Sequence, residues 1–245
     1  MRLPGSRIVE LTSAADPSDP RGGEGVAEID LAALPLETIT VTAAGRRWSI
    51  LAALDQDRLL AAAGNLRDFP YGVLLWESAL VLADVLAEEA DCLTGRTLLE
   101  LGAGTGLAGL AGAALGARVV QTDHSAEALA LCRRNATANG IVGIERRFGN
   151  WTDWRDEARY DLVVGADVLY EPELFGDIAA VLAASVAPGG RVVLTDPGRT
   201  HTDRFIERLQ GNGWEVTLAM RDCSALPPGA PGGSIPVRVI KAQQA

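Results

Sequence analysis

From residue 96 onward, short apolar segments of the chain alternate with longer segments that are expected to be helical. This alternation predicts strands at residues 97–101, 118–122, 144–148, 160–166 and 190–195, and helices at residues 106–116, 125–139, 172–187 and 201–211. Strands that alternate with helices favour a parallel sheet covered on both faces. The fourth strand is almost continuously apolar, which is typical of a buried central strand.

The pattern changes near the C-terminus. Residues 214–220 and 235–240 are two further predicted strands, and a Pro/Gly-rich loop at residues 226–233 joins them. Two strands joined without a helix indicate an antiparallel hairpin. We therefore expect an α/β fold with a seven-stranded, mostly parallel sheet, a C-terminal antiparallel hairpin and helices on both faces.

A second, shorter hairpin is predicted ahead of the sheet. Residues 37–42 alternate in polarity, residues 43–46 can turn, and residues 47–51 can return as a second strand. Residues 13–28 are rich in Asp, Pro and Gly and are expected to be flexible. The chain therefore predicts a flexible N-terminus followed by a β-hairpin extension.

Two helices are predicted between this hairpin and the sheet. The first covers residues 56–63 and stops at Gly64, and the second covers residues 75–90 with apolar side chains on one face. Glu77 and Asp84 interrupt the apolar stretch around the second helix, so it does not predict a membrane span. We expect no membrane partner.

Composition and charge exclude several function classes. The chain has 245 residues and a formal net charge of −10 at pH 7, which makes it a poor ligand for the phosphate backbone of nucleic acids. Solubility alone explains this charge, and we favour that explanation over an acidic interaction surface, although a negative rim would suit a basic, lysine-bearing protein substrate. Cys92, Cys132 and Cys223 are odd in number and far apart, and His124 and His201 have no nearby ligand partners. We expect no disulfide framework and no metal site, and a cytoplasmic location.

A glycine turn follows the first strand of the sheet. Gly102 and Gly104 let the backbone bend sharply and approach a ligand without a Cβ in the way. The third glycine of the dinucleotide fingerprint would fall at Leu107, so the motif departs from it. Glu100, two residues before the turn, would repel a pyrophosphate and suits a ligand that carries a cation.

An acidic residue ends the second strand of the sheet. Asp123 follows Glu100 by 23 residues, close to the separation of about 20 residues expected for a ribose-binding acid. A carboxylate in this place can accept hydrogen bonds from both ribose hydroxyls, although it can also serve as a loop or helix-cap acid. Strand, glycine turn, helix, strand and acid in this order favour an adenosine-type ligand.

The order of these elements resembles the class I S-adenosylmethionine-dependent methyltransferases, whose Rossmann-like sheet of seven strands ends in such a hairpin. Residues 71–79 (YGVLLWESA) and residues 167–170 (DVLY) resemble motifs of the D-x-x-Y group of protein-lysine methyltransferases. Residues 195–199 (TDPGR) are similar to a turn of the electron transfer flavoprotein β-subunit lysine methyltransferases. The resemblance covers residues 71–245, which it implies to be the methyltransferase domain, with residues 1–70 as an extension.

The resemblance implies S-adenosylmethionine as the cofactor and gives its binding residues. The backbone of Gly102, Ala103 and Gly104 would approach the methionyl part near Glu100, and Asp123 would hold the ribose. Three further residues would surround the cofactor: Trp76 packs against it, Trp151 borders the adenine, and Ala166 lies beneath that ring. Core packing is the alternative for Trp76, and Trp154 is the alternative to Trp151 at the adenine.

The resemblance also implies the residues that act on the acceptor. Asp167 and Tyr170 follow the fourth strand, at the edge where ligands bind in doubly wound sheets. Asp167 could orient an attacking amine, and Tyr170 could line the methyl channel or donate a hydrogen bond to the amine. The alternative for Asp167 is a helix-capping role near Pro172.

Four functions remain to be compared. The first is methyl transfer from S-adenosylmethionine to a protein lysine, the second is methyl transfer to a small amine, and the third is a cofactor-binding interaction module without activity. The fourth, a nicotinamide-dependent oxidoreductase, is disfavoured by Leu107, Glu100 and the terminal hairpin. The sequence favours the first.

Overall fold

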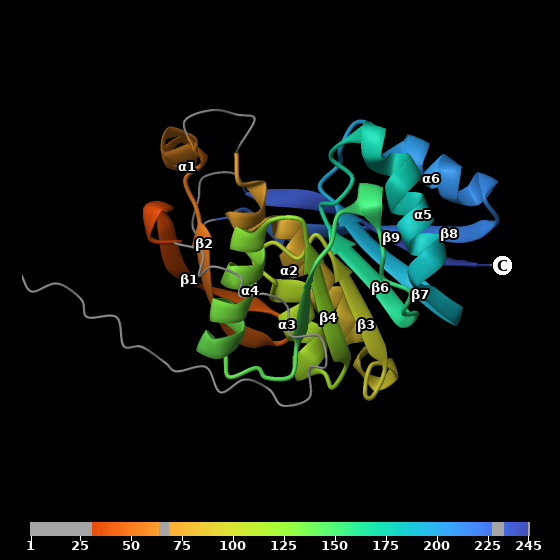
Figure 1. Ribbon diagram of the computed structural model, residues 1–245, viewed down its shortest axis with the longest axis horizontal. Helices are drawn as coiled ribbons and strands as arrows, with labels where there is room; N and C mark the ends of the chain where they lie inside the picture. Colours follow the sequence, from red (N-terminus) through yellow and green to blue (C-terminus); the bar gives the residue numbers. More distant parts are fainter. Residues whose placement is uncertain (1–30, 64–68, 227–232, 245) are drawn as a thin grey trace, which may run out of the picture.

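The computed structural model describes residues 31–63, 69–226 and 233–244, and its centre is a seven-stranded sheet with the order β5-β4-β3-β6-β7-β9-β8 (Figure 1). The strands are β3 (Thr97–Leu101), β4 (Arg118–Asp123), β5 (Glu145–Phe148), β6 (Tyr160–Ala166), β7 (Val186–Asp196), β8 (Trp214–Ser224) and β9 (Ser234–Gln244). Strands β3 to β7 pair in parallel, and β9 pairs antiparallel with both β7 and β8. The predicted seven-stranded sheet with a terminal hairpin is confirmed.

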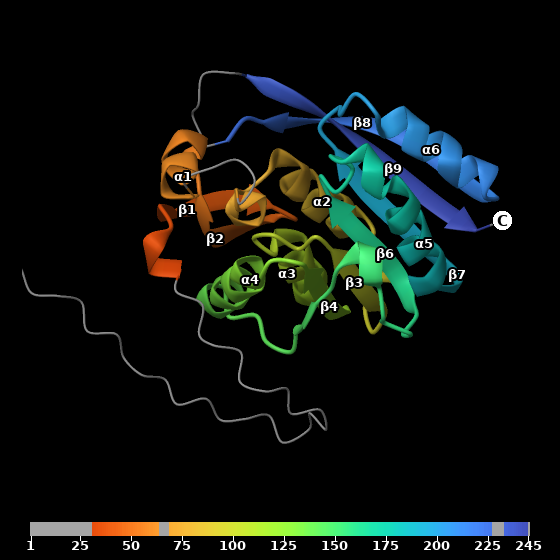
Figure 2. The ribbon, with the colours of Figure 1, turned by 45° about the horizontal axis from the view of Figure 1, so that its top comes forward.

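Helices cover both faces of this sheet (Figures 1 and 2). One face carries α2 (Glu77–Glu88), α3 (Leu107–Ala114) and α4 (Ala126–Ala138), and the other carries α5 (Phe175–Ser185) and α6 (Thr202–Gly211). Successive residues of β3 point to opposite faces of the sheet. Leu98 packs with α2 and α3, whereas Leu99 packs with α5 and α6. A strand buried on both faces needs a nearly continuous apolar sequence, which explains the composition of residues 162–166 in β6.

The N-terminal hairpin forms a separate two-stranded sheet of β1 (Leu36–Ala43) and β2 (Arg46–Ala53), followed by α1 (Gln56–Ala63). Trp48 of β2 is fully buried in the core that α2 and α3 share. The Asn135 side chain accepts a hydrogen bond from the Leu51 N–H and donates to the carbonyls of Leu51 and Thr105. The hairpin is therefore joined through α4 to the turn that follows β3.

Several boundaries differ from the sequence prediction. The helix expected at residues 172–187 divides into a 3₁₀ turn, η5 (Pro172–Leu174), and α5. Strand β7 begins already at Val186, because this residue pairs with Tyr160 of β6. The register then shifts, and regular pairing resumes between Leu162 and Arg191. The expected flexible stretch 13–28, the helix stop at Gly64 and most of the loop 226–233 lie outside the described residues.

Within the described ranges, the structure contains no helix that is long and apolar enough to cross a membrane. The same part of the chain holds no cluster of three or more His, Cys, Asp or Glu side chains with the arrangement of a metal site. The three cysteines are free thiols.

Candidate active site

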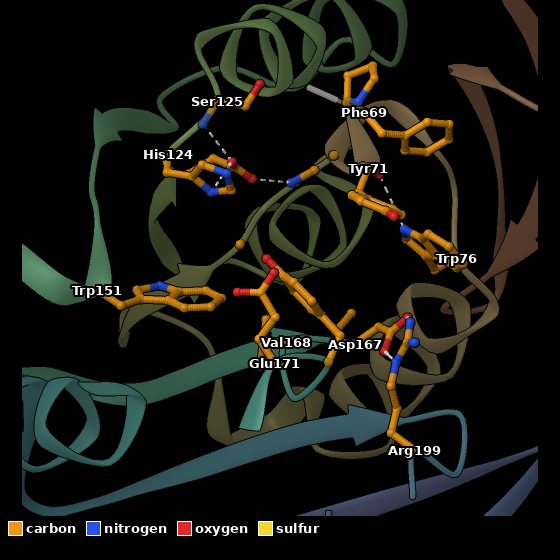
Figure 3. Close-up of a pocket in the computed structure, with 17 residues that line it drawn as sticks. Phe69, Tyr71, Trp76, His124, Ser125, Trp151, Asp167, Val168, Glu171 and Arg199 are labelled. Carbon is orange, nitrogen blue, oxygen red and sulfur yellow. Dashed lines mark hydrogen bonds and ion pairs between the residues drawn. The ribbon is translucent and has the colours of Figure 1, made fainter. Parts of the chain in front are cut away.

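A cavity of about 620 Å³ lies at the carboxyl ends of β3, β4 and β6 (Figure 3). Its volume falls within the range of about 300–1,000 Å³ that is usual for small-molecule sites. The described residues that line it are Phe69, Pro70, Tyr71, Gly72, Trp76, Gly102, Gly104, Asp123, His124, Ser125, Trp151, Ala166, Asp167, Val168, Tyr170, Glu171 and Arg199. The fold therefore brings together most of the residues that the sequence singled out.

The glycine turn forms one wall of the cavity. Gly102 and Gly104 have φ angles of +59° and +53°, in the left-handed region that favours glycine. A Cβ on Gly104 would lie 3.1 Å from the carbonyl oxygen of Gly72, and one on Gly102 would lie 3.0 Å from Val168 Cγ1. Because the neighbouring segments leave no room for side chains here, the wall consists of bare backbone.

Asp123, the last residue of β4, lies beside this wall. Its Oδ2 accepts a hydrogen bond from the Gly104 N–H at 2.9 Å, and its Oδ1 accepts one from the Ser125 N–H at 2.9 Å. Burial raises the pKa of Asp123, and these N–H donors oppose the rise. A carboxylate has about four lone-pair positions, so each oxygen keeps one acceptor position for a ligand with two hydroxyl groups.

Aromatic side chains stand on opposite sides of the cavity. Trp76 precedes α2, and its Nε1 donates a long hydrogen bond of 3.4 Å to the Tyr71 carbonyl. Figure 3 shows Trp151 across the cavity from Trp76, and a Cβ on Gly102 would lie 3.4 Å from the Trp151 ring. Trp154 is not among the described lining residues, since its ring packs against Gly149 instead. Between the two candidates for the adenine border, Trp151 is the one that reaches the cavity.

Asp167 lies at the far end of the cavity in an ion pair that the sequence analysis did not foresee. The Arg199 Nε and Nη2 donate to the two Asp167 carboxylate oxygens, each at 2.7 Å. The Asp167 backbone has a φ of +54°, and its N–H donates to the Thr195 carbonyl at 2.8 Å, which fixes the residue after β6. Burial raises the pKa of Asp167, and the Arg199 guanidinium counteracts this rise.

The turn after β7 explains why Arg199 reaches Asp167. The carboxylate of Asp196 is fully buried and accepts hydrogen bonds from the N–H groups of Gly198 and Arg199 at 3.1 and 3.2 Å. The Arg199 guanidinium also lies 5.9 Å from the centre of the Trp76 ring. The DPGR segment therefore holds Arg199 in place, a role that its family resemblance alone did not predict.

Tyr170 and Glu171 complete the lining near Asp167. Burial, the largest cause, and the charge of Glu171 raise the pKa of Tyr170 to about 12, so the phenol stays protonated and can donate a hydrogen bond at neutral pH. Glu171 precedes η5, and its side chain makes no capping hydrogen bond there. Glu171 had no predicted role in the site.

Glu100 and Ala103 are not among the described residues that line the cavity, and the roles expected for them at the cofactor stay predictions. The Glu100 carboxylate is buried under α3, where it accepts a hydrogen bond from Gln121 Nε2 at 2.8 Å. The Ala103 N–H donates a hydrogen bond to the Thr122 carbonyl. Side chains alternate along a strand, and residue 100 points to the α3 face of the sheet and not past the strand end.

The burial of Glu100 predicts a pH-dependent stability. Desolvation raises its pKa from 4.5 to about 7 in the folded protein. The protonated form therefore contributes stability that is complete below about pH 4.5 and is lost as the pH rises through about 7, which amounts to about 1 kcal/mol between pH 6 and pH 8. Glu100→Gln, which keeps an acceptor for Gln121, should remove this loss. Chemical denaturation of both proteins at the two pH values measures it, and an identical pH dependence in the variant would contradict the interpretation.

Comparison with known proteins identifies the family. The family model described as lysine methyltransferase matches residues 55–212, which is more than half of the chain. The chain belongs to the lysine methyltransferase family. This confirms the resemblance drawn from the glycine turn and the DVLY segment, and S-adenosylmethionine is the cofactor of this family.

Several curated relatives are similar in sequence. The histone-arginine methyltransferase METTL23 of Xenopus laevis is 33% identical over 51% of this chain and 56% of its own length. The protein N-lysine methyltransferase METTL21A of Xenopus tropicalis is 37% identical over 56% of this chain and 66% of its own. The EEF1A lysine methyltransferase 3 of Mus musculus is 31% identical over 60% and 66%. The chain thus spans between about half and two thirds of the length of these relatives.

Solved structures show the same fold at low sequence identity. The precorrin-6y C5,15-methyltransferase of Geobacter metallireducens matches with a TM-score of 0.57 and 16% identity, over 68% of this chain and 89% of the other. The magnesium protoporphyrin IX methyltransferase of Synechocystis, solved with bound SAH, matches with a TM-score of 0.54 and 19% identity, over 69% and 84%. These matches confirm the methyltransferase fold.

Proposed function

We propose that this protein transfers a methyl group from S-adenosylmethionine to the side-chain amine of a lysine in a protein substrate. The observation that carries the proposal is the arrangement of one cavity. The glycine turn and Asp123 form one part of its lining, Asp167 lies on the opposite side from His124, and the charges of both Asp123 and Asp167 act on Tyr170. Such a cavity can hold an adenosine-containing cofactor and leave its reactive end next to the acceptor residues.

The residues of the cavity fit the cofactor. Bound S-adenosylmethionine supplies an electrophilic methyl group on a sulfonium sulfur. The open acceptor positions of Asp123 suit the two ribose hydroxyls, and the bare backbone at Gly102 and Gly104 allows the close approach of the methionyl part. Trp151 would border the adenine above Ala166, and Trp76 would pack against the cofactor from the opposite side.

At the other end, Asp167 would orient the acceptor. Methyl transfer is an in-line displacement, so positioning the amine contributes much of the acceleration. Arg199 occupies one position on each Asp167 oxygen, and the remaining lone pairs can accept hydrogen bonds from the amine. The protonated Tyr170 phenol can donate a hydrogen bond to the same group or line the methyl channel.

Arginine is a second candidate acceptor, because one relative is named a histone-arginine methyltransferase. A guanidinium is best recognised by two parallel hydrogen bonds to a carboxylate. Arg199 already makes this bidentate contact with Asp167, so an acceptor arginine would have to displace it. The geometry therefore favours a lysine amine, which needs a single acceptor direction.

The net charge and the cysteines support a proposed protein partner and a proposed cytoplasmic location. The net charge of −10 favours a basic protein surface over nucleic acid as the partner. The three free thiols support a reducing compartment such as the cytoplasm.

The proposal is tested by following a labelled methyl group. The protein is incubated with S-adenosylmethionine that carries the label and with a cell lysate, which is then separated into protein and small-molecule fractions. We expect label in the protein fraction. Label confined to small molecules would instead support a small-amine methyltransferase, and cofactor binding in calorimetry without any transfer would support a non-catalytic binding module.

The Asp167–Arg199 pair predicts a change in the pH profile. Arg199→Gln removes the charge that holds down the pKa of Asp167, so burial should raise that pKa further. If ionised Asp167 orients the amine, the acid limb of kcat/KM should move to higher pH by the same amount. Arg199→Lys keeps a positive charge, so the acid limb should move less than in Arg199→Gln. Arg221→Gln, which removes an exposed ion pair with Glu88, serves as the control. If the acid limb of Arg199→Gln does not move, the ionisation of Asp167 does not control kcat/KM.

A further inference from the structure

The charges of the cavity are not equally available to an incoming cation. Arg199 neutralises Asp167 through two hydrogen bonds. Asp123 is engaged by the N–H groups of Gly104 and Ser125 and lies 3.6 Å from His124 Nδ1. The two predicted carboxylates that line the cavity are therefore partly compensated.

Glu171 is the third carboxylate that lines the cavity. No hydrogen bond or ion pair with another residue in the described part of the chain engages its side chain, and it does not cap η5, which it precedes. Figure 3 shows this side chain directed into the cavity, between Trp151 and Asp167. After burial, the charge of Glu171 is the largest cause of the raised pKa of Tyr170, which is consistent with a position beside the phenol.

We propose that Glu171 is a specificity-determining residue that receives the protonated amine of the acceptor lysine at the exposed side of the cavity and directs it toward Asp167 and Tyr170. The inference rests on the proposed function and adds the group that selects a cationic acceptor. It follows from the charge balance, because an ammonium group approaching Asp167 meets a carboxylate that already holds a guanidinium. Glu171 offers the uncompensated negative charge on the same path.

Because Glu171 is exposed, we expect it to affect binding of the acceptor and not the methyl-transfer step. An exposed carboxylate attracts a cation chiefly through long-range electrostatics, which affects association and is weakened by salt. Its removal should therefore change the KM for the acceptor and leave kcat nearly unchanged. Asp167, which is buried at the end of the cavity, is expected to affect kcat.

The chain offers a matched control for this test. Glu173 lies two residues further along, is exposed like Glu171, and is not among the described lining residues. Glu171→Gln and Glu173→Gln make the same change in net charge. We expect Glu171→Gln to raise the KM for a lysine-containing peptide about five- to tenfold, with a weaker dependence on ionic strength, while Glu173→Gln leaves both unchanged.

A binding measurement complements the kinetics. The same peptide is titrated into protein saturated with S-adenosylhomocysteine, and Glu171→Gln should weaken peptide binding by the same factor while leaving the affinity for S-adenosylhomocysteine unchanged. An unchanged KM, an equal effect of Glu173→Gln, or a loss of S-adenosylhomocysteine affinity would each overturn the role of Glu171. A wild-type protein that methylates no lysine would overturn the proposed function as well, and this distinguishes the two failures.

Discussion

Asp167→Asn is expected to lower the rate of methyl transfer by about 100-fold or more while S-adenosylmethionine binds with nearly unchanged affinity. The substitution keeps the size of the side chain and one acceptor oxygen, but it removes the charge that faces Arg199 and orients the amine. Asp167 lies at the end of the cavity away from Asp123, so the ribose site should not change. Transfer of labelled methyl to protein lysine and calorimetry with the cofactor measure the two effects separately.

Tyr170→Phe provides the companion measurement to this substitution. A smaller loss of transfer than in Asp167→Asn would show that the hydroxyl contributes a hydrogen bond, and nearly full activity would show that the ring alone shapes the channel. The interpretation of Asp167 fails if Asp167→Asn retains full activity. It also fails if the variant loses cofactor affinity to the same extent as transfer.

Asp123→Ala is expected to weaken the binding of S-adenosylmethionine by about 1.5–3 kcal/mol, because a charged acceptor for two hydroxyl groups is lost. The structure adds a second consequence. Asp123 also accepts hydrogen bonds from the N–H groups of Gly104 and Ser125, so the glycine turn should become less ordered and the melting temperature should fall modestly. Calorimetry and thermal unfolding of the same preparation measure both effects.

Asp123→Asn separates these two roles, because the amide oxygen can still accept one backbone hydrogen bond. It should recover part of the stability and less of the affinity. A variant of Asp123 that loses stability but binds the cofactor with full affinity per folded molecule would show that the carboxylate is purely structural.

Much of the fold could be predicted from the sequence, because local patterns determined it. The apolar run of β6 indicated a strand buried on both faces, and the absence of a helix between β8 and β9 indicated the hairpin. The left-handed backbone at Gly102 and Gly104 likewise agrees with the turn inferred from their spacing. In each case neighbouring residues along the chain carry the information.

The parts of the site that the sequence missed depend on long-range contacts. Arg199 reaches Asp167 across 32 residues of sequence, because the turn held by Asp196 lies beside the end of β6. No local periodicity could reveal this pair. The face of the sheet that Glu100 occupies was also ambiguous, since a strand buried on both sides shows no polar alternation. Glu171 was overlooked because its free charge is evident only when the other carboxylates have been placed.

The chemical identity of the methylated product tests the proposed lysine methyl transfer most directly. Protein substrate incubated with this protein and labelled S-adenosylmethionine is hydrolysed to amino acids, and the labelled species is identified by chromatography and mass spectrometry. We expect N-methylated lysine that is present with the wild-type protein and reduced about 100-fold with Asp167→Asn. Label recovered as methylarginine, or methyllysine formed equally well by both proteins, would contradict it.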